Sequence, residues 1–269
     1  MELFVTDLDG TLINKDRQVT KKSEEIINEL IKSGMNFTVA TARTPATAVE
    51  ILQNLDLKLP VALMNGVLIY DTKELKYIDI KDINIESTYK ILDIFEKYNK
   101  NPLVYGIVDN HLWVYHKEFE HAYEYNFYKE RADKELKTFV KISNYKESVL
   151  KSSIINFVAF DEYEKIKSIA EEIEKIEGIN VNYYKDVYED CYFLEAYSSE
   201  ASKANGIKYL SKYINYKNVI CFGDNLNDIP MFELANEAYA TANATEEVKK
   251  IATGVIGSCE EEGVAEILK

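Results

Sequence analysis

Residues 3–11 read LFVTDLDGT, a short apolar run that ends at two carboxylates and a glycine. Residues 3–6 have the character of a buried strand, and Gly10 lets the chain turn after it. Asp7 and Asp9 can hold a divalent cation in such a loop. Their pKa values should separate, so that one acts as nucleophile and the other as general acid and then base. The alternative is an ordinary Asp-Gly turn.

Strands and helices alternate after this loop. A helical apolar stripe at Ile26, Ile27, Leu30 and Ile31 ends at Gly34, and residues 37–40 form the next predicted strand. A helix begins at Thr44-Pro45, and a third strand covers residues 61–64 and ends at Asn65-Gly66. The alternation predicts an α/β fold, a doubly wound parallel sheet of Rossmann type, with ligands at the carboxyl ends of its strands.

In the middle of the chain, strands joined by a tight turn replace the alternation of strands and helices. Residues 105–108 and 111–115 read as strands joined by the turn Asp109-Asn110, and further strands are expected at 153–160, 181–184 and 191–196. A helix is expected at 163–176. Strand and helix units resume at 203–213, 219–222 and 229–235. We therefore expect an α+β domain at 82–190, inserted into a core domain made of 1–81 and 191–269.

Charge and composition restrict the partners. The 269 residues carry a formal charge of -14, which repels nucleic acid and anionic lipid, so neither is expected as a partner. A phosphorylated substrate would need local positive charge. Three widely spaced cysteines and the lack of a long apolar run or export signal suggest a cytoplasmic protein. The sequence does not indicate an oligomeric state.

A second acidic loop follows the predicted strand 219–222. Residues 223–228 read GDNLND and lead into a helix, so Asp224 and Asp228 also lie at a strand's carboxyl end. Magnesium prefers oxygen ligands and retains some water, so carboxylates from two loops suffice to hold it. Asp228 alone could equally be an acidic residue at a helix N-terminus.

Two further segments offer contacts to phosphate. Thr41-Ala42-Arg43 ends the second strand, where a hydroxyl and backbone N–H groups could bind a phosphate oxygen. Lys203 lies in the first turn of a helix, where the helix dipole disfavours a cation unless an anion compensates. Thr41 could instead be an ordinary residue at a strand end, and Lys203 an exposed solubilising lysine.

These segments resemble, in order and spacing, the four motifs of the haloacid dehalogenase superfamily. The large insert between Thr41 and Lys203 is similar to the α+β cap of its Cof-type (class IIB cap) sugar-phosphatase branch. Asn65-Gly66, Asn243-Ala244 and Gly263-Val264-Ala265 are similar to further signatures of that branch.

The resemblance implies a phosphatase that uses Mg²⁺ and an aspartyl-phosphate intermediate. Asp7 would attack phosphorus and ligate the metal, while Asp9 would protonate the leaving oxygen, activate water and ligate the metal through its main-chain carbonyl. Asp224 would be the third metal ligand, with Asp228 orienting it or a bound water. The transferring phosphoryl group would be held by Leu8, Thr41, Ala42, Lys203 and Asn227.

The substrate is left open by the sequence. A sugar phosphate or another small phosphorylated metabolite, including pyridoxal phosphate, fits the resemblance. Ala42 and Ala204 stand where many relatives have glycine, which concerns the fit around phosphate rather than the reaction. A phosphomutase or phosphotransferase shares the first step, and a non-catalytic metabolite sensor is a further alternative. Candidate substrate contacts in the cap, most of them expected to be core residues, are Tyr105, Trp113, Tyr115, Tyr183, Tyr184 and Tyr188.

Overall fold

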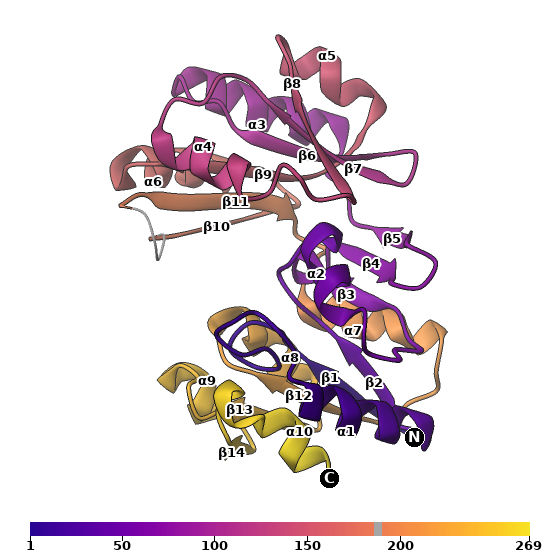
Figure 1. The fold of residues 1–269 in the computed structure, drawn as a ribbon. Coiled ribbons are helices and arrows are strands. Elements are labelled where there is room, and N and C mark those ends of the chain that lie inside the picture. The colour runs from indigo at the N-terminus through magenta and orange to yellow at the C-terminus, as the bar shows by residue number, and fades with distance from the viewer. Residues whose placement is uncertain (186–189) are drawn as a thin grey trace. The chain divides into compact units, whose positions relative to one another are not determined.

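The chain forms two compact units, each with its own core. A computed structural model describes residues 1–185 and 190–269. The first unit consists of Met1–Asp79 and Ala201–Lys269, and the second of Ile80–Glu200 (Figure 1). Tyr188, a candidate substrate contact, lies outside the described residues. No described helix combines the length and the apolar character that a membrane span requires.

The first unit is built on a five-stranded parallel sheet in the order β14-β13-β12-β1-β2. Most residues of the neighbouring strands β1 and β12 are buried, as expected for a sheet covered on both faces. This confirms the predicted fold class. The strands are β1 (Glu2–Thr6), β2 (Asn36–Val39), β12 (Asn218–Gly223), β13 (Glu237–Thr241) and β14 (Gly254–Ile256).

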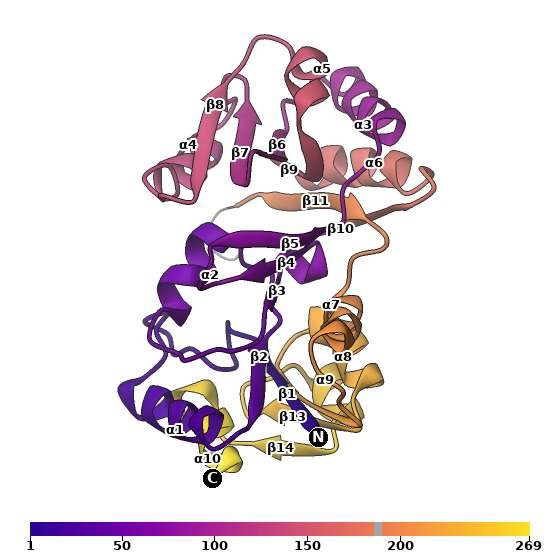
Figure 2. The ribbon, with the colours of Figure 1, turned by 90° about the vertical axis from the view of Figure 1, so that its right-hand side faces the viewer.

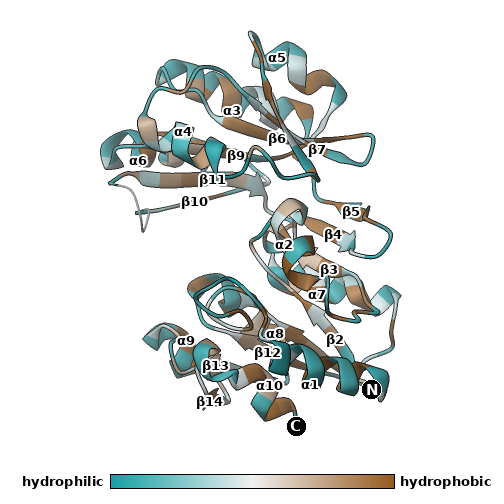
Figure 3. Cartoon of the chain, viewed as in Figure 1, coloured by the Kyte–Doolittle hydropathy of each residue, from teal (hydrophilic) through white to brown (hydrophobic). Residues whose placement is uncertain are grey.

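Helices follow the strands of this sheet. Thr20 caps the first helix by accepting a hydrogen bond from the Ser23 N–H, and Pro45 opens the second at a position where no N–H is needed. Helix α1 carries both hydrophilic and hydrophobic residues along its length (Figure 3), as an amphipathic helix should. The helices are α1 (Lys21–Lys32), α2 (Pro45–Leu52), α7 (Lys203–Tyr209), α8 (Ile229–Leu234), α9 (Glu246–Ile251) and α10 (Gly263–Leu268).

The third predicted strand belongs to a different sheet from the one expected. β3 (Val61–Leu63) pairs antiparallel with β4 (Leu68–Asp71), and with β5 (Lys76–Ile80) they form a separate three-stranded sheet. One parallel bridge, Ala40 to Ala62, joins β3 to the end of β2. The sequence indicated the strand, but the turn at Asn65-Gly66 returns the chain along β3, which the apolar pattern alone did not reveal.

The second unit has a six-stranded sheet in the order β10-β11-β9-β6-β7-β8. Helices α3 and α6 lie on one side of this sheet and α4 on the other (Figure 2). Asp109 and Asn110 both have positive φ, which suits a tight hairpin turn between β6 and β7, as predicted. The strands are β6 (Leu103–Val108), β7 (His111–His116), β8 (Lys137–Lys141), β9 (Ser153–Asp161), β10 (Ile179–Lys185) and β11 (Tyr192–Ser198). The helices are α3 (Ile85–Lys97), α4 (Ala122–Lys129), α5 (Tyr145–Ser148) and α6 (Tyr163–Ile173).

The second unit extends further than the expected boundary at 190. Strand β11, which was assigned to the core domain, pairs with β9 and β10 and therefore completes the sheet of the second unit. The compact unit runs to Glu200. The apolar run at 191–196 could be recognised as a strand, but its partners could not.

Candidate active site

The first acidic loop follows β1 directly. Asp7 is buried, and its N–H donates to the Phe222 carbonyl at 2.9 Å, which continues the pairing of β1 with β12. The Leu8 carbonyl accepts hydrogen bonds from Thr11, Leu12 and Ile13 and so closes the turn. Gly10 has a φ of +71°, and a Cβ there would lie 2.3 Å from Asp224 Oδ2. Glycine is therefore required for the two acidic loops to approach each other.

Lys203 connects the two acidic loops. Its Nζ lies 2.8 Å from Asp7 Oδ1 and 2.6 Å from Asp228 Oδ1, and all three side chains are buried. The lysine comes from the start of α7, Asp7 directly follows β1, and Asp228 lies at the N-terminus of α8. Three segments far apart in sequence thus converge on one buried ion pair network.

Asp228 organises the second acidic loop. Its Oδ2 accepts hydrogen bonds from the N–H groups of Asp224, at 2.8 Å, and Asn225, at 3.0 Å. Its Oδ1 accepts from Lys203. Both oxygens are therefore engaged within the protein, which suits a positioning role better than direct metal ligation. Asp224 Oδ1 accepts a hydrogen bond of 3.1 Å from the Thr11 hydroxyl.

The cluster carries more negative than positive charge. Burial raises the pKa of Asp7 to about 7, although Lys203 opposes the shift, and burial with the nearby Asp228 raises the pKa of Asp224 to about 6. Burial also lowers the pKa of Lys203, but the two carboxylates outweigh it and raise that pKa overall. Carboxylate oxygens of Asp7, Asp224 and Asp228 lie within 4.8 Å of one another. Three acidic groups around one lysine have the charge and donor chemistry that suit a divalent cation.

Asp9 does not join this cluster. Its side chain is half exposed, and Arg43 Nε donates to Oδ2 at 2.7 Å while Arg43 Nη2 donates to Oδ1 at 2.6 Å. A bidentate pair of this kind fixes the orientation of a carboxylate as well as attracting it. Arg43 was not assigned a role from the sequence, although its place two residues after Thr41 was a usable signal.

The predicted phosphate contacts lie around the same strand ends. Thr41 is buried; its N–H donates to the Ala62 carbonyl at 2.9 Å, and its hydroxyl accepts a hydrogen bond of 3.3 Å from the Arg43 N–H. The Thr41 N–H is therefore already used, and its hydroxyl is the better candidate for a phosphate contact. Ala42 is exposed beside it. A hydrogen bond from the Leu8 backbone favours the ionised form of Asp7 and so opposes the rise in its pKa.

Two asparagines and a second glycine make contacts between the loops that surround the acidic cluster. Asn227 Nδ2 donates to Asn65 Oδ1 at 3.1 Å, and Asn243 Nδ2 donates to the Gly10 carbonyl at 2.8 Å. Gly66 has a φ of +87°, and a Cβ there would lie 2.1 Å from the Ser202 carbonyl oxygen, immediately before Lys203. Asn65-Gly66 and Asn243-Ala244 were recognised only as signatures, and the structure gives them supporting roles around the acidic loops.

Comparison with known proteins identifies the family. A model of the haloacid dehalogenase-like hydrolases matches residues 4–268. The chain belongs to this family, as its motifs indicated. It is a phosphoric monoester hydrolase, a class whose chemistry suits buried carboxylates at the carboxyl ends of parallel strands.

The relatives span the whole chain. A putative phosphatase of Buchnera aphidicola (subspecies Schizaphis graminum) is 28% identical, over 99% of this chain and 94% of its own. The 5-amino-6-(5-phospho-D-ribitylamino)uracil phosphatase YitU of Bacillus subtilis is 24% identical, over 99% and 96%. The structure of the subclass IIB sugar phosphatase BT4131 superposes with a TM-score of 0.74 at 19% identity, covering 100% of this chain and 98% of that one. This likeness supports the Cof-type fold expected from the sequence.

Proposed function

We propose that the chain hydrolyses the phosphate monoester of a small cytoplasmic metabolite, a sugar phosphate or similar compound, through a phosphorylated Asp7. The observation that supports this most directly is the contact of Lys203 with Asp7 and Asp228 inside a buried acidic cluster. In the reaction an Asp7 oxygen forms a bond to phosphorus while the bond to the leaving oxygen breaks. Water then attacks the aspartyl phosphate, which releases inorganic phosphate and restores Asp7.

Lys203 serves two purposes in this proposal. Its ammonium group opposes the effect of burial and favours the ionised Asp7 that a nucleophile requires. It also supplies fixed positive charge beside the transferring phosphoryl group in a chain whose net charge would otherwise repel phosphate. Thr41, Asn227 and the backbone at Leu8 and Ala42 are the proposed additional contacts to phosphoryl oxygens.

Magnesium is the proposed cofactor, held by Asp7, Asp224 and the Asp9 main-chain carbonyl, with Asp228 positioning Asp224. When bound, it neutralises negative charge on the phosphoryl oxygens. Asp228 contributes through its two backbone hydrogen bonds to the second loop, and Thr11 fixes the Asp224 carboxylate from the first.

Asp9 is the proposed general acid and base. It would protonate the leaving oxygen in the first step and accept a proton from the attacking water in the second. Because Arg43 binds both carboxylate oxygens of Asp9, proton transfer requires at least one of those hydrogen bonds to open. Arg43 therefore acts as a positioning residue for the proposed acid.

Phosphate release from sugar phosphates, pyridoxal phosphate, nucleotides and p-nitrophenyl phosphate tests this function. We expect release in Mg²⁺, none in EDTA, and none from Asp7→Asn, whose amide cannot attack phosphorus. Asp56→Asn, an exposed aspartate of the same unit, is the matched control and should retain full activity. Full turnover by Asp7→Asn would refute the covalent mechanism, and release unaffected by EDTA would refute the metal requirement.

A further inference from the structure

The turn that follows β13 contacts both acidic loops of the first unit. Thr241 Oγ1 and Asn243 Nδ2 both donate to the Gly10 carbonyl, at 3.2 Å and 2.8 Å. The Thr245 N–H, at the far end of the turn, donates to the Asp224 carbonyl at 2.9 Å. This turn, called the bridging turn below, therefore holds a backbone carbonyl of each acidic loop. It comprises residues 241–245.

Gly10 lies between the bridging turn and the second acidic loop. Its carbonyl oxygen accepts the two hydrogen bonds from the turn, whereas a Cβ on its α-carbon would lie 2.3 Å from Asp224 Oδ2. Asp7 belongs to the same loop as Gly10, and its carboxylate lies in one cluster with that of Asp224. The spacing of these two carboxylates therefore depends on where the bridging turn holds Gly10.

A further contact fixes Asn243 itself. Its Oδ1 accepts a hydrogen bond of 3.1 Å from the Cys259 N–H, so both ends of the amide are used, one as acceptor and one as donor to Gly10. The Asn243 side chain is exposed, and hydrogen bonds that compete with water contribute little to overall stability. We therefore expect this amide to affect the position of the loop more than the stability of the fold.

The C-terminal segment holds Cys259 in place. Gly263, at the start of α10, packs so closely against Gly257 that a Cβ at position 263 would lie 1.9 Å from the Gly257 carbonyl oxygen. The Gly263 N–H also donates to the Ser258 carbonyl at 3.1 Å. Both C-terminal signatures of the sequence thus belong to one series of contacts that ends at Gly10.

We propose that Asn243 is a positioning residue for the metal site, and that the bridging turn sets the spacing between the carboxylates of the two acidic loops. This inference rests on the proposed function, because it concerns the binding of Mg²⁺ by Asp7 and Asp224. Magnesium requires near-ideal octahedral geometry, so a small displacement of one loop weakens its binding. Groups that orient metal ligands without touching the metal change metal affinity roughly 10- to 100-fold when they are removed.

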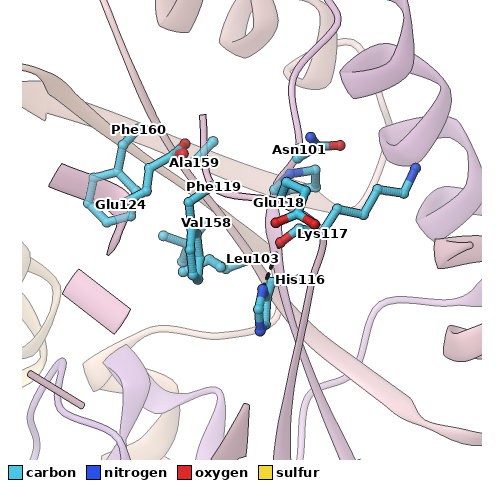
Figure 4. A pocket seen from close by; sticks show the side chains of 11 residues that line it. Asn101, Leu103, His116, Lys117, Glu118, Phe119, Glu124, Val158, Ala159 and Phe160 are labelled. Carbon is cyan, nitrogen blue, oxygen red and sulfur yellow. Dashed lines mark hydrogen bonds between the residues drawn. The ribbon is translucent and has the colours of Figure 1, made fainter. Parts of the chain in front are cut away.

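Hollows in the second unit carry less. One of about 560 Å³ beside α3 is lined in part by Lys100 and Lys146, but both are already paired with carboxylates. A small pocket next to α4 (Figure 4), lined by His116 and Phe160 among others, has a volume of about 10 Å³. That is room for about one water molecule. Neither hollow points to a particular ligand.

Titration with Mg²⁺ tests the proposal. Asn243→Ala should lower the Mg²⁺ affinity measured by calorimetry roughly 10- to 100-fold, and Thr241→Val, which removes the longer hydrogen bond to Gly10, should lower it less. Asn236→Ala is the matched control, because it removes a hydrogen bond of 2.8 Å from the Val219 N–H at the opposite end of β12. Its Mg²⁺ affinity should stay within about twofold of the wild-type value.

Two results of this titration would overturn the proposal. One is an unchanged Mg²⁺ affinity in Asn243→Ala, or an equal loss in Asn243→Ala and Asn236→Ala. The other is the absence of Mg²⁺ binding by the wild-type protein.

A hydrogen-exchange measurement separates this inference from the proposed function. In the metal-free protein, Asn243→Ala should accelerate exchange of the Thr11 and Leu12 amides, which donate to the Leu8 carbonyl, whereas Asn236→Ala should not. Faster exchange together with weaker Mg²⁺ binding supports the positioning role even if the protein hydrolyses no phosphate ester, which would refute only the proposed function. Unchanged exchange in Asn243→Ala contradicts the positioning role even if phosphatase activity is established.

Discussion

Asp7 illustrates how a single buried residue combines opposing requirements. A nucleophile must be ionised, whereas burial at the end of β1 favours its protonated form. Lys203 offsets part of that cost, and a divalent cation would offset more of it. The same balance applies to Asp224, whose oxygen also bonds to Thr11. Stability and metal affinity of this unit should therefore depend on pH together.

The first prediction concerns that dependence. The folded pKa values of Asp7 (about 7) and Asp224 (about 6) lie above the ordinary value for aspartate, so the folded protein retains protons that the unfolded chain releases. In EDTA the Tm should fall as pH rises from about 4 to 7. Mg²⁺ binds the ionised form, so it should raise the Tm more at pH 8 than at pH 5. Calorimetry at several pH values measures both effects, and an equal Mg²⁺ effect at pH 5 and pH 8 would contradict this coupling.

The second prediction concerns Arg43. Arg43→Ala removes both hydrogen bonds that orient Asp9, so transfer of a proton to the leaving oxygen should become less efficient. We expect kcat to fall roughly 10-fold or more for a sugar phosphate, within the range that general acid catalysis contributes. The fall should be smaller for p-nitrophenyl phosphate, because its leaving group departs without a proton. Steady-state kinetics on both substrates distinguishes this role from a general loss of folding, which would lower both equally.

Individual site residues could be predicted from the sequence where they follow the end of a predicted strand. Asp7, Asp224 and Asp228 could be grouped because each follows the carboxyl end of a predicted parallel strand. The pairing of Asp9 with Arg43 could not be predicted, since the two residues are 34 positions apart and their contact depends on the turn geometry after Thr41.

The turn that follows β3 contacts the residue that precedes α7, so these two elements are positioned together. Asn65 and Gly66 have positive φ and form a turn after β3, and Gly66 lies against the Ser202 backbone. Any side chain at position 66 would therefore displace the start of the helix that carries Lys203.

The third prediction follows from this contact. Gly66→Ala should lower the Tm and the catalytic rate together, because its Cβ would meet the Ser202 carbonyl oxygen at 2.1 Å. Gly178→Ala is a matched control, since Gly178 has a similar φ of +82° but no atom within 4 Å of the added Cβ. The control should cost only about 1 kcal/mol in the free energy of unfolding, with activity retained. Equal effects of the two substitutions would show that backbone strain, rather than the clash, limits position 66.

Several elements escaped prediction for a physical reason. The hairpin β4–β5 and the strands β13 and β14 are short and offer few residues to a pattern search. In addition, β13 and β14 are separated in sequence by α9, so their pairing is not indicated by a tight turn. The strands β1, β2 and β12 were recognised because their continuous apolar runs are typical of buried parallel strands. β11 was recognised as a strand yet placed in the core domain, because pattern alone does not show which sheet completes its hydrogen bonds.

At the scale of the molecule, the second unit is one continuous segment. It has its own buried core, contributed by its sheet and by α3 and α6, and its chain ends lie together: Lys81 Nζ is 3.8 Å from Glu200 Oε2. Each of these properties is typical of a segment that can fold independently.

The fourth prediction is that residues 80–200 fold when produced alone. The excised segment should show a cooperative thermal transition and the dispersed NMR signals of a packed core. Phe157→Ala, which removes a fully buried ring, should lower the free energy of unfolding by about 3–5 kcal/mol. A segment that lacks a cooperative transition would show that its stability depends on the first unit.

Because the two ends of the second unit lie close together, this segment can be exchanged as a whole during evolution. Strand β5 leads into this segment at Asp79–Ile80 and the chain leaves it at Glu200–Ala201, so one exchange of DNA between these two codons would replace the whole segment. The register between β1 and β12, on which Asp7 and the second acidic loop depend, would be preserved in the resulting chimera. Selection could therefore act on this segment separately from the acidic loops of the first unit.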